Sequence, residues 1–179
     1  MDLPQGTSGL PGAVRQLGYV VRDLDQTIAD WLKLGVGPWF VLRGHSQSVL
    51  YRGRPCTVPV SLAFANSGDL QIELIQQEDD TPSVFTEFLD SGRVGVHQLA
   101  WWAADFPAAL ESARALGWPV VWSGGEEGKG ARFAYLEPPA GPAPIVELSE
   151  LTPAVEGLAK LVREAADGWD GSVPVRPLG

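Results

Sequence analysis

The sequence predicts an α+β fold made of two related halves, each with the order strand, helix and three strands. Three observations predict it. Residues 16–35 align without gaps with residues 98–117. Within each copy, the apolar spacing changes from the alternation of a strand to the stripe of an amphipathic helix. Each half also ends in a similar strand, QIELIQ at 71–76 and PIVELSE at 144–150, so two open sheet faces would be buried against each other.

The internal repeat keeps the residues that begin and end its helix. Five positions are identical in the two copies: Gln16 and Gln98, Leu17 and Leu99, Asp23 and Asp105, Leu34 and Leu116, and Gly35 and Gly117. An Asp before the first helical residue caps the free backbone N–H groups, and a Gly after the last residue ends the helix. A match that keeps both boundaries indicates one structural unit present twice.

The first half follows an N-terminal arm, residues 1–13, which we expect to be flexible. The predicted elements are a strand at 14–21, a helix at 23–34, a strand at 38–43, a long polar loop at 44–56, and strands at 57–65 and 70–76. The last two strands flank Asn-Ser-Gly-Asp at 66–69, a sequence typical of a hairpin turn. The loop at 44–56 has no hydrophobic period, so we expect it to be mobile and to border the concave face of the sheet.

The second half follows a short helix at 81–92. Its predicted elements are a strand at 94–102, a helix at 105–117, and strands at 118–123, 131–137 and 143–150, with a mobile Gly-rich loop at 124–130. An amphipathic helix at 152–166 and an irregular tail at 168–179 complete the chain. We therefore divide the chain into the arm (1–13), a first module with its connecting helix (14–92), a second module (93–151), and a C-terminal helix and tail (152–179).

The composition suits a water-soluble protein with a core, and the charge narrows the range of partners. The 179 residues have a formal net charge of -9, which argues against nucleic acid or an anionic membrane surface. Cys56 is the single cysteine, so an intrachain disulfide is excluded and a cytoplasmic location is expected. No apolar run is long enough to cross a bilayer, and the N-terminal stretch lacks the apolar core of a signal peptide.

Side-chain alternation along the strands predicts a polar cluster on the concave side of the sheet. In each half, the bulkier apolar face of the first strand must lie under the helix, which leaves Gln16 and Gln98 on the other face. The same alternation puts Glu73 and Glu147 on that face in the last strands of the two halves. Two buried carboxylates must be paired, protonated or bound to a cation. If the strand faces are inverted, both are surface carboxylates instead.

These motifs resemble those of the vicinal oxygen chelate superfamily, which includes glyoxalase I, methylmalonyl-CoA epimerase, extradiol dioxygenases and bleomycin-resistance proteins. QLGYVVRDLD at 16–25 resembles the family's HIGIAVxDLD opening, IELIQ at 72–76 its IELLE, VHQLAWW at 96–102 its LHHIAFEV, and IVELSE at 145–150 its closing VLVELVE. The resemblance covers about residues 14–151. It implies a glyoxalase-like fold, in which paired βαβββ modules form a curved mixed sheet around a metal-containing cleft, with ligands at Gln16, Glu73, Gln98 and Glu147.

The chain departs from the family pattern at two of these ligand positions. The family usually has His where this chain has Gln16 and Gln98, and His97 matches a neighbouring non-ligand His that alternation points to the helix-covered side. Two amide oxygens and two carboxylates, without a nitrogen ligand, favour Mg, Mn or Ca over Zn or Ni. The alternative is a metal-free pocket in which the Gln amides hydrogen-bond the carboxylates or a substrate carbonyl.

Two functions of different classes fit these residues. The first is a lyase, isomerase or epimerase acting on a small carbonyl compound. The resemblance implies Glu147 as the base and Glu73 as a metal ligand or second acid/base, and the two Gln amides would then stabilise the enolate oxygen. The second is a protein of the bleomycin-resistance kind, which binds an aromatic ligand without chemistry. An extradiol dioxygenase is disfavoured because its iron site needs two His.

The expected partner in either case is a small molecule with an apolar or aromatic part. The aromatic side chains expected to form its wall are Trp39, Phe40, Trp102 and Trp122, although they equally suit the core. Members of the family are often dimeric, so the resemblance also suggests a homodimer in which the C-terminal helix and tail could serve the interface.

Overall fold

The computed structural model describes residues 10–140 and 143–178. The first half contains β1 (Gln16–Val20), α1 (Leu24–Lys33), β2 (Trp39–Tyr51), β3 (Arg54–Ser67) and β4 (Leu70–Gln77). After α2 (Val84–Asp90), the second half contains β5 (Gly95–Ala103), α3 (Phe106–Ala115), β6 (Val120–Gly124), β7 (Phe133–Leu136) and β8 (Ile145–Glu150). The chain ends with α4 (Pro153–Ala166) and β9 (Val175–Pro177). Most of the predicted arm, residues 1–9, lies outside the described residues.

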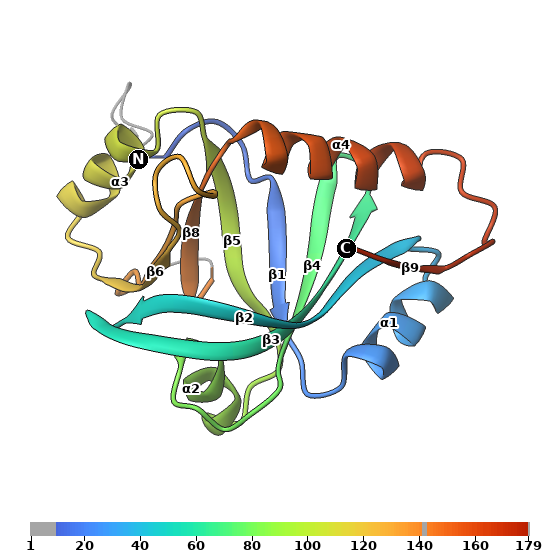
Figure 1. Ribbon diagram of the computed structural model, residues 1–179, viewed down its shortest axis with the longest axis horizontal. Helices are drawn as coiled ribbons and strands as arrows, with labels where there is room; N and C mark the ends of the chain where they lie inside the picture. The colour runs from blue at the N-terminus through green and yellow to red at the C-terminus, as the bar shows by residue number, and fades with distance from the viewer. Residues whose placement is uncertain (1–9, 141–142, 179) are drawn as a thin grey trace, which may run out of the picture.

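The strands form one mixed sheet that curves until it closes. Its order is β3-β4-β1-β5-β8-β7-β6-β2, and β2 also pairs with β3, which completes the ring. The first and last strands of each half are parallel neighbours, β1 with β4 and β5 with β8, and β1 meets β5 antiparallel. Figure 1 shows the long strands β2 and β3 running across the direction of β1, β4 and β5. The predicted α+β class and curved mixed sheet are confirmed.

Each half buries its outer sheet face under its own helix. The packed residues are Leu17, Leu24, Ile28 and Leu74 around α1, and Trp101, Phe106, Ala113 and Leu148 around α3. The two helices begin alike, because the side chains of Asp23 and Asp105 accept hydrogen bonds from the backbone N–H groups of Gln26 and Ala108. With the apolar residues of these strands under the helices, their polar residues lie on the inner face.

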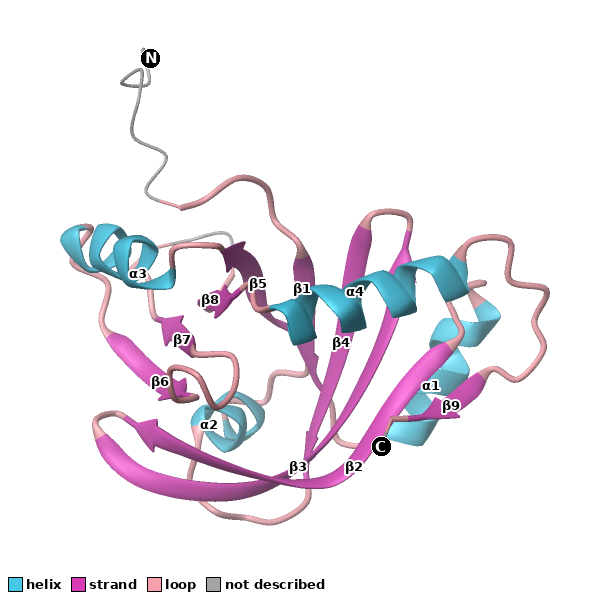
Figure 2. Cartoon of the chain, turned by 45° about the horizontal axis from the view of Figure 1, so that its top comes forward, coloured by secondary structure: helices cyan, strands magenta, loops and turns pink. Residues whose placement is uncertain are grey.

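The C-terminal helix α4 lies across the sheet of its own chain. Its buried residue Val162 packs with Phe40 of β2 and Phe64 of β3, and Figure 2 shows α4 crossing β1 and β4. The tail after α4, predicted to be irregular, contains β9, which pairs parallel to β2 with Val175 opposite Trp39. A strand of three residues is too short to leave a period in the sequence. No helix in the described ranges is long and apolar enough to span a membrane.

The prediction of a long loop at 44–56 is wrong. β2 continues to Tyr51 and β3 begins at Arg54, so the segment is an antiparallel hairpin in which Ser48 faces Thr57. Its turn has Gly53 at φ 79°, a backbone conformation that suits glycine. The hairpin is hidden in the sequence because consecutive residues at 43–46 are all exposed, so no period of two remains.

Candidate active site

The inner face of the closed sheet bounds a cavity of about 270 Å³. Polar side chains from both halves line it: Gln16, Gln47, Gln71 and Glu73 from the first, and Tyr135, Glu147 and Ser149 from the second. Its apolar wall includes Phe64, Trp102, Phe133 and, from α4, Leu158. Gln16, Glu73 and Glu147, which stand far apart in the sequence, therefore face the same cavity.

Gln98 lies next to this cavity and joins its two halves by hydrogen bonds. Its side chain is fully buried on β5. The amide Nε2 donates to Glu73 Oε2 at 3.4 Å and to the Tyr135 hydroxyl oxygen at 3.0 Å. Gln16, its counterpart in the repeat, instead donates from Nε2 to Gln71 Oε1 at 2.8 Å. Gln98, Glu73 and Tyr135 are therefore joined by hydrogen bonds, and the Gln16–Gln71 amide pair lines the same cavity.

The prediction that His97 points to the helix-covered side is wrong. The pairing of β1 with β5 shifts by one residue, since Gly18 faces Gln98 while Tyr19 faces Val96. His97 is the extra residue of this bulge, and alternation fails there. Its Nδ1 donates to Gln98 Oε1 at 2.5 Å. Burial lowers the pKa of His97 to about 4, so the ring is neutral at pH 7 and holds the Gln98 amide in place.

The two carboxylates of the cluster have perturbed proton affinities. Burial raises the pKa of Glu147 to about 7, against a smaller opposing effect of the Ser149 hydroxyl, which donates to Glu147 Oε1 at 2.7 Å. Burial, and after it repulsion from Glu147, raises the pKa of Glu73 well above its ordinary value. Near neutral pH, therefore, only one of the two carboxyl groups is ionised at a time. One ionised and one protonated carboxyl group in a cavity are suited to acid–base chemistry.

Tyr135 is a member of the cluster that the sequence analysis did not single out. It stands on β7 directly opposite Glu147 of β8 and accepts the hydrogen bond from Gln98. Burial, with the nearby Glu147 and Glu73, raises the pKa of Tyr135, so its hydroxyl stays protonated and can donate in turn. Alternation along the strand ARFAYLE places Tyr135 on the same face as Phe133, and this signal could have identified it.

The aromatic residues predicted to form a substrate wall lie in different places. Trp102 lines the cavity. Phe40 packs with Phe64 and Val162 beneath α4. Trp39 lies in the core under α1, and Trp122 lies in the core beside Phe85. Both of these tryptophans are fully buried, so we retain only Trp102 as a candidate wall residue.

The cluster does not fit a divalent cation in the orientation that the chain gives it. A cation needs the Gln98 oxygen, but His97 engages that oxygen and the amide N–H groups point to Glu73 and Tyr135. Among residues 10–140 and 143–178, no three His, Cys, Asp or Glu side chains form a group that could hold a metal ion. The ligand set implied by the resemblance would require the Gln98 amide to turn over.

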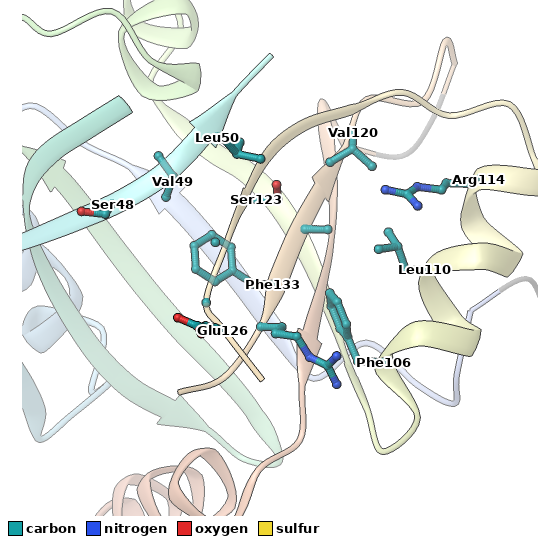
Figure 3. A pocket seen from close by; sticks show the side chains of 14 residues that line it. Ser48, Val49, Leu50, Phe106, Leu110, Arg114, Val120, Ser123, Glu126 and Phe133 are labelled. Carbon is teal, nitrogen blue, oxygen red and sulfur yellow. The ribbon is translucent and has the colours of Figure 1, made fainter. Parts of the chain in front are cut away.

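A larger hollow lies outside the sheet and has different chemistry. Its volume is about 630 Å³, and α3, β6 and the end of β2 bound it, with Phe106, Leu110 and Val120 on its wall (Figure 3). None of the four residues predicted for the site lines it, although Phe133 borders both hollows. Chemistry rather than size therefore identifies the inner cavity as the candidate site.

Comparison with known proteins gives one matching family profile and several solved structures with a similar fold. The profile of the Glyoxalase/Bleomycin resistance protein/Dioxygenase superfamily matches residues 15–135, while no curated protein matches the chain significantly. A methylmalonyl-CoA epimerase from Mycobacterium tuberculosis is 22% identical with a TM-score of 0.57, covering 86% of this chain and 97% of that one. A hypothetical protein from Bacillus halodurans is 17% identical with a TM-score of 0.57, covering 78% and 94%. A variant methylmalonyl-CoA epimerase from Streptomyces coelicolor, in complex with 2-nitronate-propionyl-CoA, is 22% identical with a TM-score of 0.55, covering 79% and 95%.

Proposed function

This chain belongs to the glyoxalase/bleomycin resistance protein/dioxygenase superfamily, and we propose that it is an enzyme that moves a proton next to a carbonyl group, as an isomerase, epimerase or lyase does. The observation that carries the proposal is the pair Glu73 and Glu147, two carboxylates facing one cavity with raised pKa values. Such a pair supplies a base and an acid at the same pH. Glu147 lies beyond the matched residues 15–135, so its role rests on the geometry of the cavity.

In the proposed reaction, ionised Glu147 takes a proton from the carbon next to the carbonyl. The C–H electron pair becomes a carbon–carbon double bond, and the carbonyl π pair moves to oxygen, giving an enolate. Protonated Glu73 supplies a hydrogen-bond donor for that oxygen, and the Gln98 amide, which donates to Glu73 Oε2, holds Glu73 in position. Return of a proton to the opposite face of the same carbon gives an epimer, and return to the neighbouring carbon gives an isomer.

A divalent ion of the Mg, Mn or Ca class is the alternative that the resemblance suggests for this site. The proposed proton transfer does not use this ion, because the Gln98 oxygen is bound to His97. Metal analysis of the purified protein, before and after treatment with a chelator, distinguishes the two. A stoichiometric ion that is needed for activity would show that the Gln98 amide turns over in the active protein.

The test of the proposed function is exchange of substrate hydrogen with heavy water. We expect the protein to speed deuterium incorporation next to the carbonyl of at least one compound in a panel. The panel starts with methylmalonyl-CoA, which is bound in one of the structural neighbours, and continues with uncharged ketones. Mass spectrometry measures the incorporation, and Glu147→Gln is the matched control. Exchange at the buffer rate for every compound would contradict the proposal.

The second candidate function is binding of an aromatic ligand without chemistry. The apolar wall of the cavity favours it, since Phe64, Phe133 and Leu158 surround the polar cluster. Tight binding of a compound that undergoes no exchange would support this alternative. A cytoplasmic location and a homodimer stay predictions, which fractionation of cells and measurement of the mass in solution would test.

A further inference from the structure

The cavity is acidic and has no positive charge to balance it. Glu73 and Glu147 line it, and none of its lining residues, all within the described ranges, is Lys, Arg or His. Two arginines approach from outside but are engaged elsewhere. Arg15 stacks on the Trp102 ring at 4.9 Å, and Arg132 pairs with Glu150 at 2.7 Å. A carboxylate ligand in this cavity would therefore meet repulsion from ionised Glu147, with no cation among the lining residues to offset it.

The hydrogen-bonding groups that line the cavity also indicate which groups a ligand must bring. The Ser149 hydroxyl and the Gln98 amide already donate to the cluster itself, and the Gln16 amide donates to Gln71. Protonated Glu73 is the donor that the proposed reaction assigns to the carbonyl oxygen, and the Tyr135 hydroxyl, which stays protonated, lies directly opposite Glu147. The amide oxygen of Gln47, an acceptor that lines the cavity, is buried without a hydrogen bond. A ligand that complements this oxygen must therefore bring a hydrogen-bond donor.

We propose that the cavity selects an uncharged carbonyl compound that carries a hydroxyl group and an aromatic ring, and that it rejects a carboxylate in the place of the hydroxyl group. Gln47 of β2 is the specificity-determining residue, because its oxygen accepts the hydrogen bond from the ligand hydroxyl. Phe64, Phe133 and Leu158 provide the surface for the ring. The carbonyl in this description rests on the proposed function, whereas the preference for a donor and against an anion rests on the lining alone.

Three probes of similar size test this selection. They are 2-hydroxyacetophenone, acetophenone, which lacks the hydroxyl, and phenylglyoxylate, which has a carboxylate in its place. At pH 8, where Glu147 is mostly ionised, we expect the hydroxyl compound to bind about tenfold more tightly than acetophenone, the effect of one good hydrogen bond. Phenylglyoxylate should bind at least tenfold more weakly than the hydroxyl compound. Titration followed by ligand NMR gives the three dissociation constants.

A matched pair of variants assigns the effect to Gln47. Gln47→Met keeps the length of the side chain but removes the acceptor, so the hydroxyl compound and acetophenone should bind equally. Gln26→Met, on the outer helix α1, makes the same chemical change away from the cavity and should keep the tenfold difference. Thermal unfolding of both variants checks that the fold is intact.

Several outcomes overturn the inference. They are equal or tighter binding of phenylglyoxylate, no measurable binding of the hydroxyl compound, and an undiminished hydroxyl advantage in Gln47→Met. These measurements need no turnover, so they are separate from the exchange experiment. A protein that shows the binding preference but no deuterium exchange would contradict the proposed enzyme and leave the ligand selection standing. Deuterium exchange without the binding preference would support the proposed enzyme and contradict the ligand selection.

Discussion

Gln16 and Gln98 hold the same position in the two copies of the repeat, but they have different partners. Gln16 pairs with the amide of Gln71, whereas Gln98 binds Glu73 and Tyr135. The cause lies in the neighbouring strand. In the pairing of β1 with β5, Gln16 stands opposite Ala100 and Gln98 stands opposite Gly18. Equivalent positions in the repeat thus meet unequal surroundings.

Gly18 makes room for the side chain that lies over it. A Cβ atom at this position would lie 2.2 Å from Cδ and Nε2 of Gln98. Ala100, its counterpart in the repeat, carries that Cβ atom opposite Gln16. One methyl group therefore separates a glutamine that reaches the carboxylates from one that stays at the edge of the cluster. The comparison shows that a repeat preserves the framework while single small residues decide the site chemistry.

The two halves also differ in the length of their middle strands. β2 and β3 have 13 and 14 residues, whereas β6 and β7 have 5 and 4. The long hairpin reaches β6 to close the ring, and it also pairs with β9 and packs against α4. The first half thus supplies the closure of the cavity, and the second half supplies Tyr135 and Glu147, which face each other there.

The largest expected effect is on the rate of proton transfer, and it should differ between variants of the two carboxylates. Glu147→Gln should reduce proton transfer by about 10²–10⁴-fold, because it removes the general base while keeping the shape of the side chain. Glu73→Gln should reduce it less, because a protonated carboxyl group and an amide both donate hydrogen bonds. The deuterium exchange rate of each variant, with its melting temperature as a control for folding, measures the difference. Equal exchange rates for wild type and Glu147→Gln would show that Glu147 is not the base.

The next effect is a pH dependence of stability. Burial raises the pKa of Glu147 to about 7 from the ordinary value of 4.5, so the folded protein binds more protons between these values than the unfolded chain. The free energy of unfolding should therefore fall as pH rises from 4.5 to 7, by up to about 3 kcal/mol from this group, and level off above. Urea unfolding of wild type and Glu147→Gln at several pH values tests this, and curves that run parallel would contradict it.

A smaller effect tests the role of the missing methyl group. Gly18→Ala should displace Gln98 and leave Glu73 and Tyr135 without their shared donor, at a cost of about 1–3 kcal/mol in the free energy of unfolding. Ala100→Gly, the reverse change in the other half, should cost about 1 kcal/mol or less because it removes only one methyl group. Chemical denaturation measures both. A larger loss for Ala100→Gly than for Gly18→Ala would contradict the explanation.

The smallest expected effect concerns metal affinity. Gln98→His replaces an amide held by His97 with an imidazole next to Glu73, and should raise affinity for Zn or Ni about tenfold. Gln16→His, beside Gln71 at the edge of the cluster, should gain less. Calorimetric titration of both variants and wild type with Zn gives the order. No gain for Gln98→His would show that an imidazole at 98 does not reach the carboxylates.

The sequence by itself determined the repeat, the helices and the side of the sheet on which the polar residues lie. Period, capping residues and alternation are local properties, so the positions of Gln16, Glu73 and Glu147 on the inner face followed from them. The same local rules failed where the period is broken. The hairpin after Leu42 begins with four consecutive exposed residues, 43–46, and the bulge at His97 inserts one residue into the alternation.

The tertiary structure decided everything that depends on pairing between distant strands. Ring closure through β2, the position of α4 over the cavity and the meeting of Tyr135 with Gln98 join segments far apart in the chain. No local period specifies which residue of one strand stands opposite which residue of another, and shifts of one residue change the partners of a whole cluster. Except for the 44–56 hairpin and β9, the helices and strands were therefore readable from the sequence, whereas the hydrogen bonds around Glu73 and Glu147 required the register that folding sets.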